Sequence, residues 1–431
     1  MIDRSENAHP RKRLLGGGRR VGLTATIGAT ITGLVLAGGL GSPAAAGVSQ
    51  DHGAATRKAQ VAHISGLVRD EMRTDHLKAV IVRVTKGDRV VMTKAFGKSM
   101  TGVPATTGMR FRNGAVAFAY VSTLLLRFVD QGKVRLGAPV SRWFPDLPLS
   151  RRVTLKMLAN QTSGYPDYEE DPTFIADFLR DPFQKFSFKQ RLSIAFSRPQ
   201  LFPPGTNWSY SHTNFMLLGK ILSKIGGKPL HRLLRQQVLR PMGLTSTTAS
   251  QTAKIPDPVL HSFSSERRAF FGLPADQPFY EESTFWNAAW GTPVGATQTT
   301  TIADMTATAD AVGAGTLLSK RSHRLMTGPN LLGFGRPQAN CVPECFTQVK
   351  GYNYGLGVVR SGAWLLQNPL LGGYSAAMAN LPKRRLSIAV AATFKAAAFD
   401  AEGNYPGNPS DKLWRLIGKY LAPKNPPPIK K

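Results

Sequence analysis

The hydrophobic and polar positions near the start of the chain predict one helix followed by a β-hairpin. Residues 56–76 carry apolar side chains at helical spacing. Two short apolar runs follow, at 79–85 and 89–96, and the polar segment Lys86-Gly87-Asp88 between them is typical of a tight turn. A helix and two paired strands therefore open the folded part of the chain.

The middle of the chain is predicted to be helical, and the last third returns to strands. Helical spacing is strongest after Ala115 and ends at Gly132, which predicts a buried helix. Further helices are expected at 215–225 and 229–239, and a closing helix at 411–421. The segments with the character of strands are 354–359, 364–367, 375–381 and 386–393. Strands at both ends with helices between them indicate an α/β (α+β) domain whose sheet is completed by the two chain ends.

The first 46 residues have the pattern of an export signal. A basic stretch that includes Arg19-Arg20 precedes an apolar run from Val21 to Leu40 and the small-residue site Ala44-Ala45-Ala46. The paired arginines are similar to those of a bacterial twin-arginine signal. The alternative is an uncleaved membrane anchor, because the run is about long enough to cross a bilayer. We predict an exported protein, periplasmic, in the cell envelope or extracellular, with a linker at 47–57 and a disordered tail at 422–431.

The net charge of the chain is more informative about its partners than its composition is. The chain has 42% hydrophobic and 19% charged residues, which is ordinary for a globular protein. Its formal net charge is +29, and removal of residues 1–46, with six basic and two acidic residues, leaves +25. We expect attraction to an anionic envelope polymer, no nucleic acid, and membrane contact only through an uncleaved signal or the surface charge. A solvated basic surface without a specific partner is the alternative.

The chain has two cysteines, Cys341 and Cys345, four residues apart in a loop that contains a proline. In an oxidising compartment this pair can close a small disulfide ring. Two thiols at this spacing, without a second Cys or His pair nearby, fall short of a zinc site. We expect a disulfide candidate, no metal and no cofactor.

Two segments carry motifs in a fixed order. One runs from Phe111-Arg112-x-Gly114 through Val129-Asp130-x-Gly132-Lys133 to Pro145, and the other is Pro203-Pro204-Gly205-Thr206-x-Trp208-x-Tyr210-Ser211. Together they resemble the superfamily of class C β-lactamases, D,D-carboxypeptidases and related esterases over nearly all of residues 58–421. The resemblance implies a β-lactamase/transpeptidase-like fold with an antiparallel sheet. Its α/β part would comprise 58–112 and 290–421, and its mainly helical part 113–289.

The resemblance places five positions at an active site, and four of them depart from the family. Where the family has the nucleophile and the base of a Ser-x-x-Lys motif, this chain has Ala115 and Phe118. Tyr210 matches the tyrosine of the family's Tyr-x-Asn motif, whose third position is His212 here. Gln367 falls near the place of the family's His-x-Gly or Lys-Thr-Gly. No Ser-x-x-Lys motif occurs anywhere in the chain.

These substitutions predict a non-catalytic binding or regulatory protein of the cell envelope. Alanine has no atom that can attack a carbonyl, and loss of such a nucleophile costs on the order of a millionfold in turnover. The expected ligand is a peptidoglycan-like peptide, with Tyr210 and His212 as candidate binding residues. The alternative is a divergent serine hydrolase of esterase, amidase or β-lactamase type with an unassigned nucleophile and His212 as a base.

The roles of Tyr210, of His212 and of three aromatic pairs each have two possible interpretations from the sequence. Tyr210 is either a ligand-binding residue or a packing residue beneath Trp208. His212 is either a base or a hydrogen-bonded pocket histidine, and a dyad with Ser211 is not expected because neighbouring side chains diverge. The aromatic pairs at 270–271, 279–280 and 285–286 are candidates for one wall of a cleft, or for core.

Overall fold

The structure is a computed structural model that describes residues 44–249, 252–274, 276–296, 299–341, 343–405 and 407–428. The predicted export signal at 1–46 lies outside these residues except for its last three positions. Within the described ranges, no helix combines the length and the hydropathy that a membrane crossing requires. The folded unit described below comprises Gly53–Lys431.

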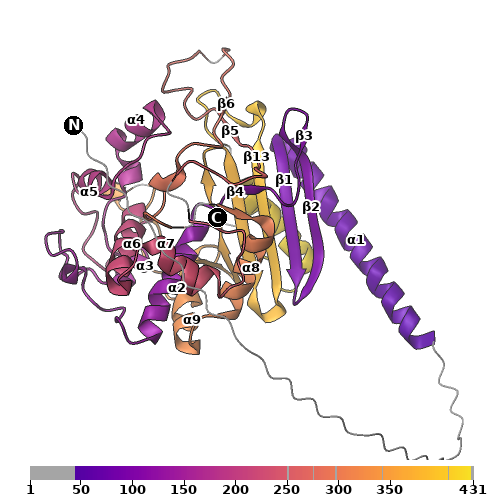
Figure 1. The fold of residues 1–431 in the computed structure, drawn as a ribbon, viewed down its shortest axis with the longest axis horizontal. Helices are drawn as coiled ribbons and strands as arrows, with labels where there is room; N and C mark the ends of the chain where they lie inside the picture. Colours follow the sequence, from indigo (N-terminus) through magenta and orange to yellow (C-terminus); the bar gives the residue numbers. More distant parts are fainter. Residues whose placement is uncertain are drawn as a thin grey trace, which may run out of the picture. The chain divides into compact units, whose positions relative to one another are not determined.

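A nine-stranded sheet is built from both ends of the folded unit. Its order is β3-β2-β1-β13-β12-β10-β9-β8, with β11 also paired to β12. Strand β1 (Leu77–Lys86) is antiparallel to β2 (Arg89–Met100) on one side and to β13 (Leu386–Phe394) on the other, so strands from the beginning and the end of the folded unit lie side by side (Figure 1). The remaining strands of this sheet are β3 (Val103–Pro104), β8 (Asn353–Tyr354), β9 (Val359–Ser361), β10 (Trp364–Gln367), β11 (Leu370–Leu371) and β12 (Tyr374–Leu381). The predicted α/β (α+β) class and antiparallel sheet are confirmed.

Helices cover both faces of the sheet. Every residue of β12 and β13 is buried, which is why these strands have continuous apolar character in the sequence. On one face, helix α10 (Pro409–Leu421) and the folded unit's part of helix α1 (Ala44–Thr74) form a core with alternate residues of β1, β12 and β13. On the other face, helix α8 (Ile302–Ala314) packs on β12 and β13. The site described below lies at the edge of this second core.

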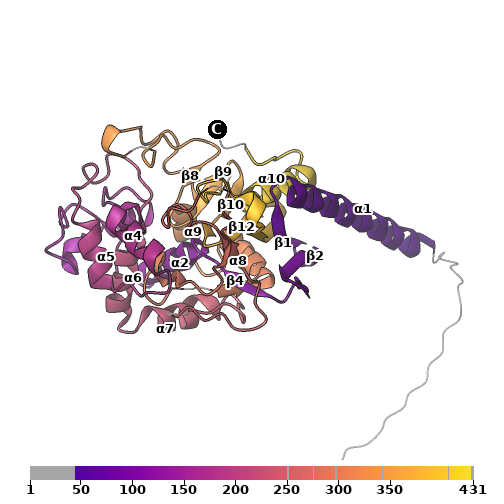
Figure 2. The same ribbon diagram turned by 90° about the horizontal axis from the view of Figure 1, so that it is seen from above.

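The helical part surrounds helix α2 (Val116–Asp130). Twelve of the fifteen residues of α2 are buried, as expected for a helix that is apolar on nearly all sides. Figure 2 shows helices α4 to α7 gathered on the side of α2 away from β1 and β2. The other helices are α3 (Leu155–Ala159), α4 (Pro172–Arg180), α5 (Phe188–Ala195), α6 (His212–Gly226), α7 (Leu230–Leu234) and α9 (Lys320–Thr327). Between residues 240 and 290 the chain is mostly irregular, with the short strands β5 (Phe263–Ser264) and β6 (Glu281–Glu282).

Three expectations from the sequence differ from the structure. The expected linker at 47–57 lies inside α1. The expected strand at 354–359 is a hairpin of β8 and β9, because Gly357 adopts a φ of 69° at its turn. The tail is ordered to residue 428, since Trp364 Nε1 donates to the carbonyl oxygen of Asn425 at 2.9 Å and Arg415 Nη1 to that of Pro428 at 2.6 Å.

Candidate functional site

A cavity of about 340 Å³ lies where the start of α2, the start of α6 and the end of β10 meet. Four of the five positions singled out in the sequence line it: Ala115, Tyr210, His212 and Gln367. The other described residues that line it are Gly114, Glu169, Ala288, Trp290, Gly291, Thr292, Tyr352, Asn368, Pro369, Leu370 and Leu371. Segments as far apart in the chain as Gly114 and Leu371 therefore form one site.

Ala115 is brought to the cavity by the glycine before it. Gly114 has a φ of 43°, and a Cβ atom at this position would lie 2.5 Å from Pro369 Cβ and 2.9 Å from Leu371 Cδ2. Only glycine allows the backbone to turn here while it touches the segment after β10. Ala115 is the N-cap of α2 and has no side-chain group that could cap the helix. The position that the resemblance assigns to a serine thus presents a methyl group to the cavity.

Phe118 lies behind the cavity wall and is fully buried. Its ring stacks on Phe215 with centroids 4.0 Å apart and planes inclined by 6°. The same ring meets the edge of His212 at 5.8 Å and lies 6.0 Å from the ring of Tyr210. The position that the resemblance assigns to a lysine is therefore a packing residue that supports Tyr210 and His212 in the cavity wall.

Tyr210 lines the cavity and packs against the rings of Phe118, His212 and Tyr354, with the His212 ring 5.1 Å away. Its partners are these rings, whereas Trp208 packs against Phe346, Tyr352 and Tyr354. Burial raises the pKa of the Tyr210 phenol well above its usual value. At neutral pH, Tyr210 is thus a neutral hydrogen-bonding group on the wall.

His212 forms an ionic cluster with two carboxylates. Its Nδ1 lies 2.8 Å from Asp167 Oδ2 and 3.2 Å from Glu169 Oε2, and its side chain is 21% exposed. Burial by itself would lower the pKa of His212, but Glu169 and Asp167 raise it to about 9. Burial raises the pKa of Glu169 to about 8, against the attraction of His212. At neutral pH, His212 is therefore protonated, and Glu169 mostly keeps its own proton, so Asp167 at 2.8 Å is the nearer acidic partner of the imidazolium.

The loop that carries the two acids is tied to the start of α6. Ser211 Oγ and Thr213 Oγ1 both donate to the carbonyl oxygen of Pro166, at 3.2 and 2.7 Å. The Asp167 side chain accepts a hydrogen bond from the backbone N–H of Glu169 and so orders the acidic turn. Because Ser211 is buried and directed to Pro166, it forms no dyad with His212, as expected.

A strained residue supports the same region from below. Gln161 has a φ of 67°, which costs about 1–3 kcal/mol for a residue other than glycine. Its Oε1 accepts hydrogen bonds from Asn214 Nδ2 at 2.5 Å and from the backbone N–H of Ser211 at 3.3 Å. Ser163 Oγ in turn donates to Asn214 Oδ1 at 2.6 Å. This network holds the start of α6, and with it His212, in place.

Gln367 ends strand β10 and is 2% exposed. Its Nε2 donates to the carbonyl oxygen of Gly357 at 2.7 Å. The amide at this position therefore braces the hairpin of β8 and β9 and carries no charge. The described residues that line the cavity include no serine, cysteine, lysine or arginine.

Sequence reasoning missed Asp167, Glu169 and Tyr352. A signal for the first two was present, since 167–171 holds four of the 26 acidic residues of a strongly basic chain. Of the two alternatives left open for the aromatic pairs at 270–271, 279–280 and 285–286, a wall of this cavity is not what the structure shows: none of the six lines it, whereas Trp290 and Tyr352 do. In the described ranges, no three side chains of the kinds that bind metals are arranged as a metal site.

The two cysteines form a disulfide. Cys345 pairs with Ser209 in an isolated antiparallel bridge, and the disulfide packs on Phe202. The ring therefore braces the segment that leads into Tyr210.

An antiparallel sheet closed by both chain ends, with a helical part inserted and a cavity at the junction, defines the β-lactamase/transpeptidase-like class of proteins. The β-lactamase family model matches residues 64–407. The chain belongs to the β-lactamase family, whose members include serine hydrolases of the penicillin-binding-protein, carboxypeptidase and amidase types.

Curated relatives match parts of this chain. It is 30% identical over 183 residues to penicillin-binding protein 4 of Amycolatopsis lactamdurans; the match covers 41% of this chain and 46% of the relative. It is 32% identical over 155 residues to the D-alanyl-D-alanine-carboxypeptidase/endopeptidase AmpH of Escherichia coli; the match covers 34% of this chain and 38% of the relative. The matched segments thus span less than half the length of these relatives.

Solved structures share the fold at low sequence identity. The D-amino acid amidase of Ochrobactrum anthropi, in complex with D-phenylalanine, has a TM-score of 0.69 at 20% identity, over 85% of this chain and 99% of the amidase. A D-stereospecific amidohydrolase from Streptomyces has a TM-score of 0.64 at 22% identity, over 79% of this chain and 94% of the amidohydrolase. These likenesses are evidence for the fold.

Proposed function

We propose that this protein is a non-catalytic member of the β-lactamase family that binds its ligand in the 340 Å³ cavity without forming an acyl-enzyme. One observation carries the proposal: Ala115, at the family's nucleophile position, presents only a methyl group to the cavity. A carbonyl group held there meets no attacking atom, so the site can position a ligand but cannot acylate.

The surroundings of His212 support binding over general-base catalysis. A general base must be unprotonated near neutral pH, whereas the two acids raise the pKa of His212 to about 9. Its Nδ1 is also taken up by Asp167. The cation of His212 stands beside the ring of Phe118, so a positive charge stays near the place where the family has a lysine.

The cavity suits a short peptide or an amino-acid derivative. Its volume falls within the range of small-molecule sites, and its walls combine apolar groups with a few polar ones. Asn368, Tyr210 and Tyr352 offer neutral hydrogen-bonding groups, and Ala288, Trp290 and Leu370 offer apolar contacts. The names of the relatives, which include D-alanyl-D-alanine carboxypeptidases, favour a peptide that ends in D-amino acids.

The same proposal places the protein outside the cytoplasm, with a peptidoglycan-like peptide as its partner. The export-like pattern at 1–46 and the penicillin-binding proteins among its relatives support this location. An anionic envelope polymer is a second class of partner, which the net charge of +29 favours.

The decisive experiment measures acylation and binding on the same purified protein. We expect intact-mass spectrometry to detect no adduct after incubation with a fluorescent penicillin or a fluorophosphonate. Isothermal titration with N-acetyl-D-alanyl-D-alanine should show saturable binding at one site. Filling the cavity with Ala115→Trp should abolish this binding, and Ala253→Trp, on an irregular segment outside the residues that line the cavity, is the matched control.

A stoichiometric adduct, or turnover of nitrophenyl esters that His212→Ala removes, would establish the divergent hydrolase instead. The double variant Ala115→Ser with Phe118→Lys tests whether the frame of the family's site is intact. We expect it to gain slow acylation by penicillin, and Ala115→Ser alone to gain less, because the serine then lacks a proton acceptor.

A further inference from the structure

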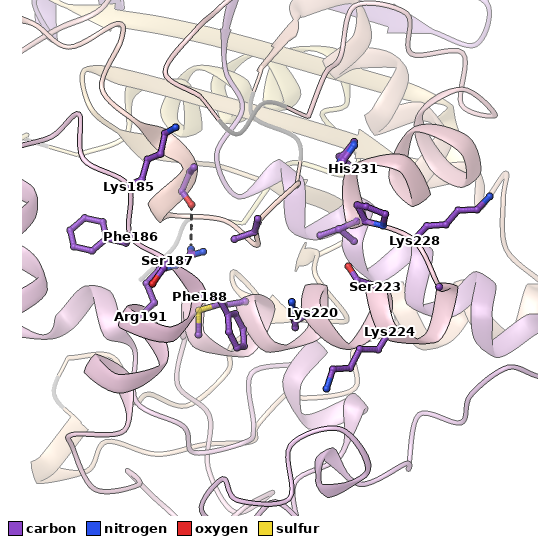
Figure 3. A pocket seen from close by; sticks show the side chains of 16 residues that line it. Lys185, Phe186, Ser187, Phe188, Arg191, Lys220, Ser223, Lys224, Lys228 and His231 are labelled. Atoms are coloured by element: carbon purple, nitrogen blue, oxygen red, sulfur yellow. Dashed lines mark hydrogen bonds between the residues drawn. The ribbon is translucent and has the colours of Figure 1, made fainter. Parts of the chain in front are cut away.

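A second cavity, of about 760 Å³, lies between helices α5, α6 and α7 (Figure 3). It shares no lining residue with the first cavity, and the segment 288–292 lies between the two. Four lysines line it: Lys185, Lys220, Lys224 and Lys228. All four are exposed, and none forms an ion pair with any residue that the structure describes. The described residues that line this cavity include no aspartate or glutamate. The cavity is therefore a concentrated source of positive potential.

The lysines are held close together by the geometry of α6. Lys220 and Lys224 are four residues apart and project from the same side of the helix, and Lys228 follows just after its C-terminus. Figure 3 shows Lys220 and Lys224 on α6 and Lys228 beyond its end, with Lys185 across the cavity; the side chains of Lys224 and Lys228 extend outward from the rim. Lys224 Nζ donates to the carbonyl oxygen of Trp143 at 3.1 Å, and Lys228 Nζ to Gln236 Oε1 at 3.4 Å, so an anion at the rim would have to draw both from these neutral partners. Like charges at this spacing destabilise a helix unless an anion lies between them.

A buried cation adds to this potential from the floor. Arg191 lines the cavity and is fully buried, and its Nη1 donates to the carbonyl oxygens of Ala289, Trp290 and Thr292. No carboxylate among the described residues forms an ion pair with Arg191, and its Nε and Nη2 have no hydrogen-bond partner there. Nη1 also lies 3.3 Å from the Tyr168 hydroxyl, and the guanidinium group lies 5.5 Å from the Tyr168 ring and interacts with Glu169, so the cation is held in the wall of the cavity without a salt bridge.

The walls of this cavity are apolar. Phe186, Met216 and Leu230 are buried beneath the lysines, and Phe188 lies half-buried with Lys220 Nζ 5.8 Å from its ring. A small inorganic anion would leave this apolar surface uncovered, and a neutral apolar molecule would leave the lysines unpaired. The combination matches a ligand that joins an apolar body to a negative group.

We propose that this cavity binds an amphiphilic organic anion, namely an alkyl or aromatic body that carries a phosphate. The phosphate pairs with Lys220, Lys224 and Lys228 at the rim, and the apolar body contacts Phe186 and Leu230. The site is separate from the cavity at Ala115 and does not depend on the function proposed for it.

The test uses the whole protein and octyl phosphate as the probe, below its micelle-forming concentration, in isothermal titration. Octyl glucoside has the apolar body without the charge, and inorganic phosphate has the charge without the body. We expect one saturable site for octyl phosphate and at least tenfold weaker binding of the other two. Comparable binding of inorganic phosphate, or no saturable binding of octyl phosphate, overturns the proposal.

Two variants of equal net charge separate this site from general attraction. The triple change Lys220→Gln, Lys224→Gln and Lys228→Gln should weaken octyl phosphate binding at least tenfold, and circular dichroism should show an intact fold because the three side chains are exposed. The matched control replaces three exposed lysines elsewhere, Lys58, Lys156 and Lys320, by glutamine and should bind as the wild type does. An equal loss in both variants means non-specific attraction and overturns the proposal.

Vesicle binding distinguishes two sources of the phosphate group, a lipid headgroup and a soluble amphiphilic phosphate. Cosedimentation with phosphatidylglycerol vesicles that the lysine triple abolishes, and the control triple does not, supports a lipid headgroup. Binding of octyl phosphate without vesicle binding supports a soluble amphiphilic phosphate.

Discussion

The ionic cluster at His212 makes the stability of this protein depend on pH, and Glu169→Gln is the change that tests it. Glu169 Oε2 lies 3.2 Å from His212 Nδ1, and its side chain is 14% exposed. The variant keeps the size and shape of the side chain but removes the charge that Glu169 acquires as the pH rises through about 8. Any change in the behaviour of His212 then reports the electrostatic contact alone.

The size of the effect follows from the pKa of each group. The pKa of His212 rises from an ordinary 6.5 to about 9, worth roughly 3–4 kcal/mol at about 1.4 kcal/mol per pH unit. A group with a raised folded-state pKa stabilises the fold fully below its unfolded pKa, and this stabilisation is lost as pH rises through the folded value. For His212, the loss therefore falls between about pH 6.5 and 9.

Glu169 acts in the same direction, because burial raises its pKa from 4.5 to about 8. The wild type should thus lose stability continuously from about pH 5 to 9. In Glu169→Gln, residue 169 no longer releases a proton as the pH rises. We expect the pKa of His212 to fall by about 1 unit or more, because the charge of Glu169 no longer raises it. The curve of unfolding free energy against pH should become flatter by at least about 1 kcal/mol over this range.

Urea unfolding at each pH, together with histidine NMR titration of His212, measures both quantities. Glu402→Gln, at an exposed position, is the control and should leave the curve parallel to that of the wild type. A wild-type pKa of His212 near 6.5, or parallel curves for the wild type and Glu169→Gln, would refute the reasoning.

Three further changes test the frame of the site. Phe118→Ala should cost about 3–5 kcal/mol in urea unfolding, because it removes a fully buried, stacked ring. Gly114→Ala should cost more than Gly132→Ala: both glycines have positive φ, which costs about 1–2 kcal/mol, but only the first would clash. Equal losses would contradict the assigned close approach. Replacing both Cys341 and Cys345 by alanine should cost about 2 kcal/mol or less, since the closed loop is short. If the wild type unfolds at the same urea concentration with and without a reducing agent, the disulfide does not contribute to stability.

Much of the fold could be read from the sequence because its signals are local. The hairpin of β1 and β2 and the buried helix α2 were predicted within a few residues, since their periodicity and turn residues are encoded in short segments. The hairpin of β8 and β9 was missed, because a glycine with positive φ interrupts a run that has strand composition.

The site was only partly predictable. The positions Ala115, Tyr210, His212 and Gln367 came from motif spacing, and they do meet in one cavity. The partners of His212 lie about 45 residues before it, on a loop that no periodicity describes, and their distance to the imidazole depends on how that loop folds back. Without that distance, a histidine with an ordinary pKa and one with a pKa of about 9 look the same in a sequence.

The sequence by itself determined the fold class, the register of the family motifs and the absence of a Ser-x-x-Lys pair, because residue identity and spacing are sufficient for each. Only the tertiary structure decided that Phe118 is a packing ring, that His212 is a cation between two acids, and that exposed lysines surround an apolar cavity. The physical reason is that charge state and ligand chemistry depend on distance and burial, and contacts between remote segments set both.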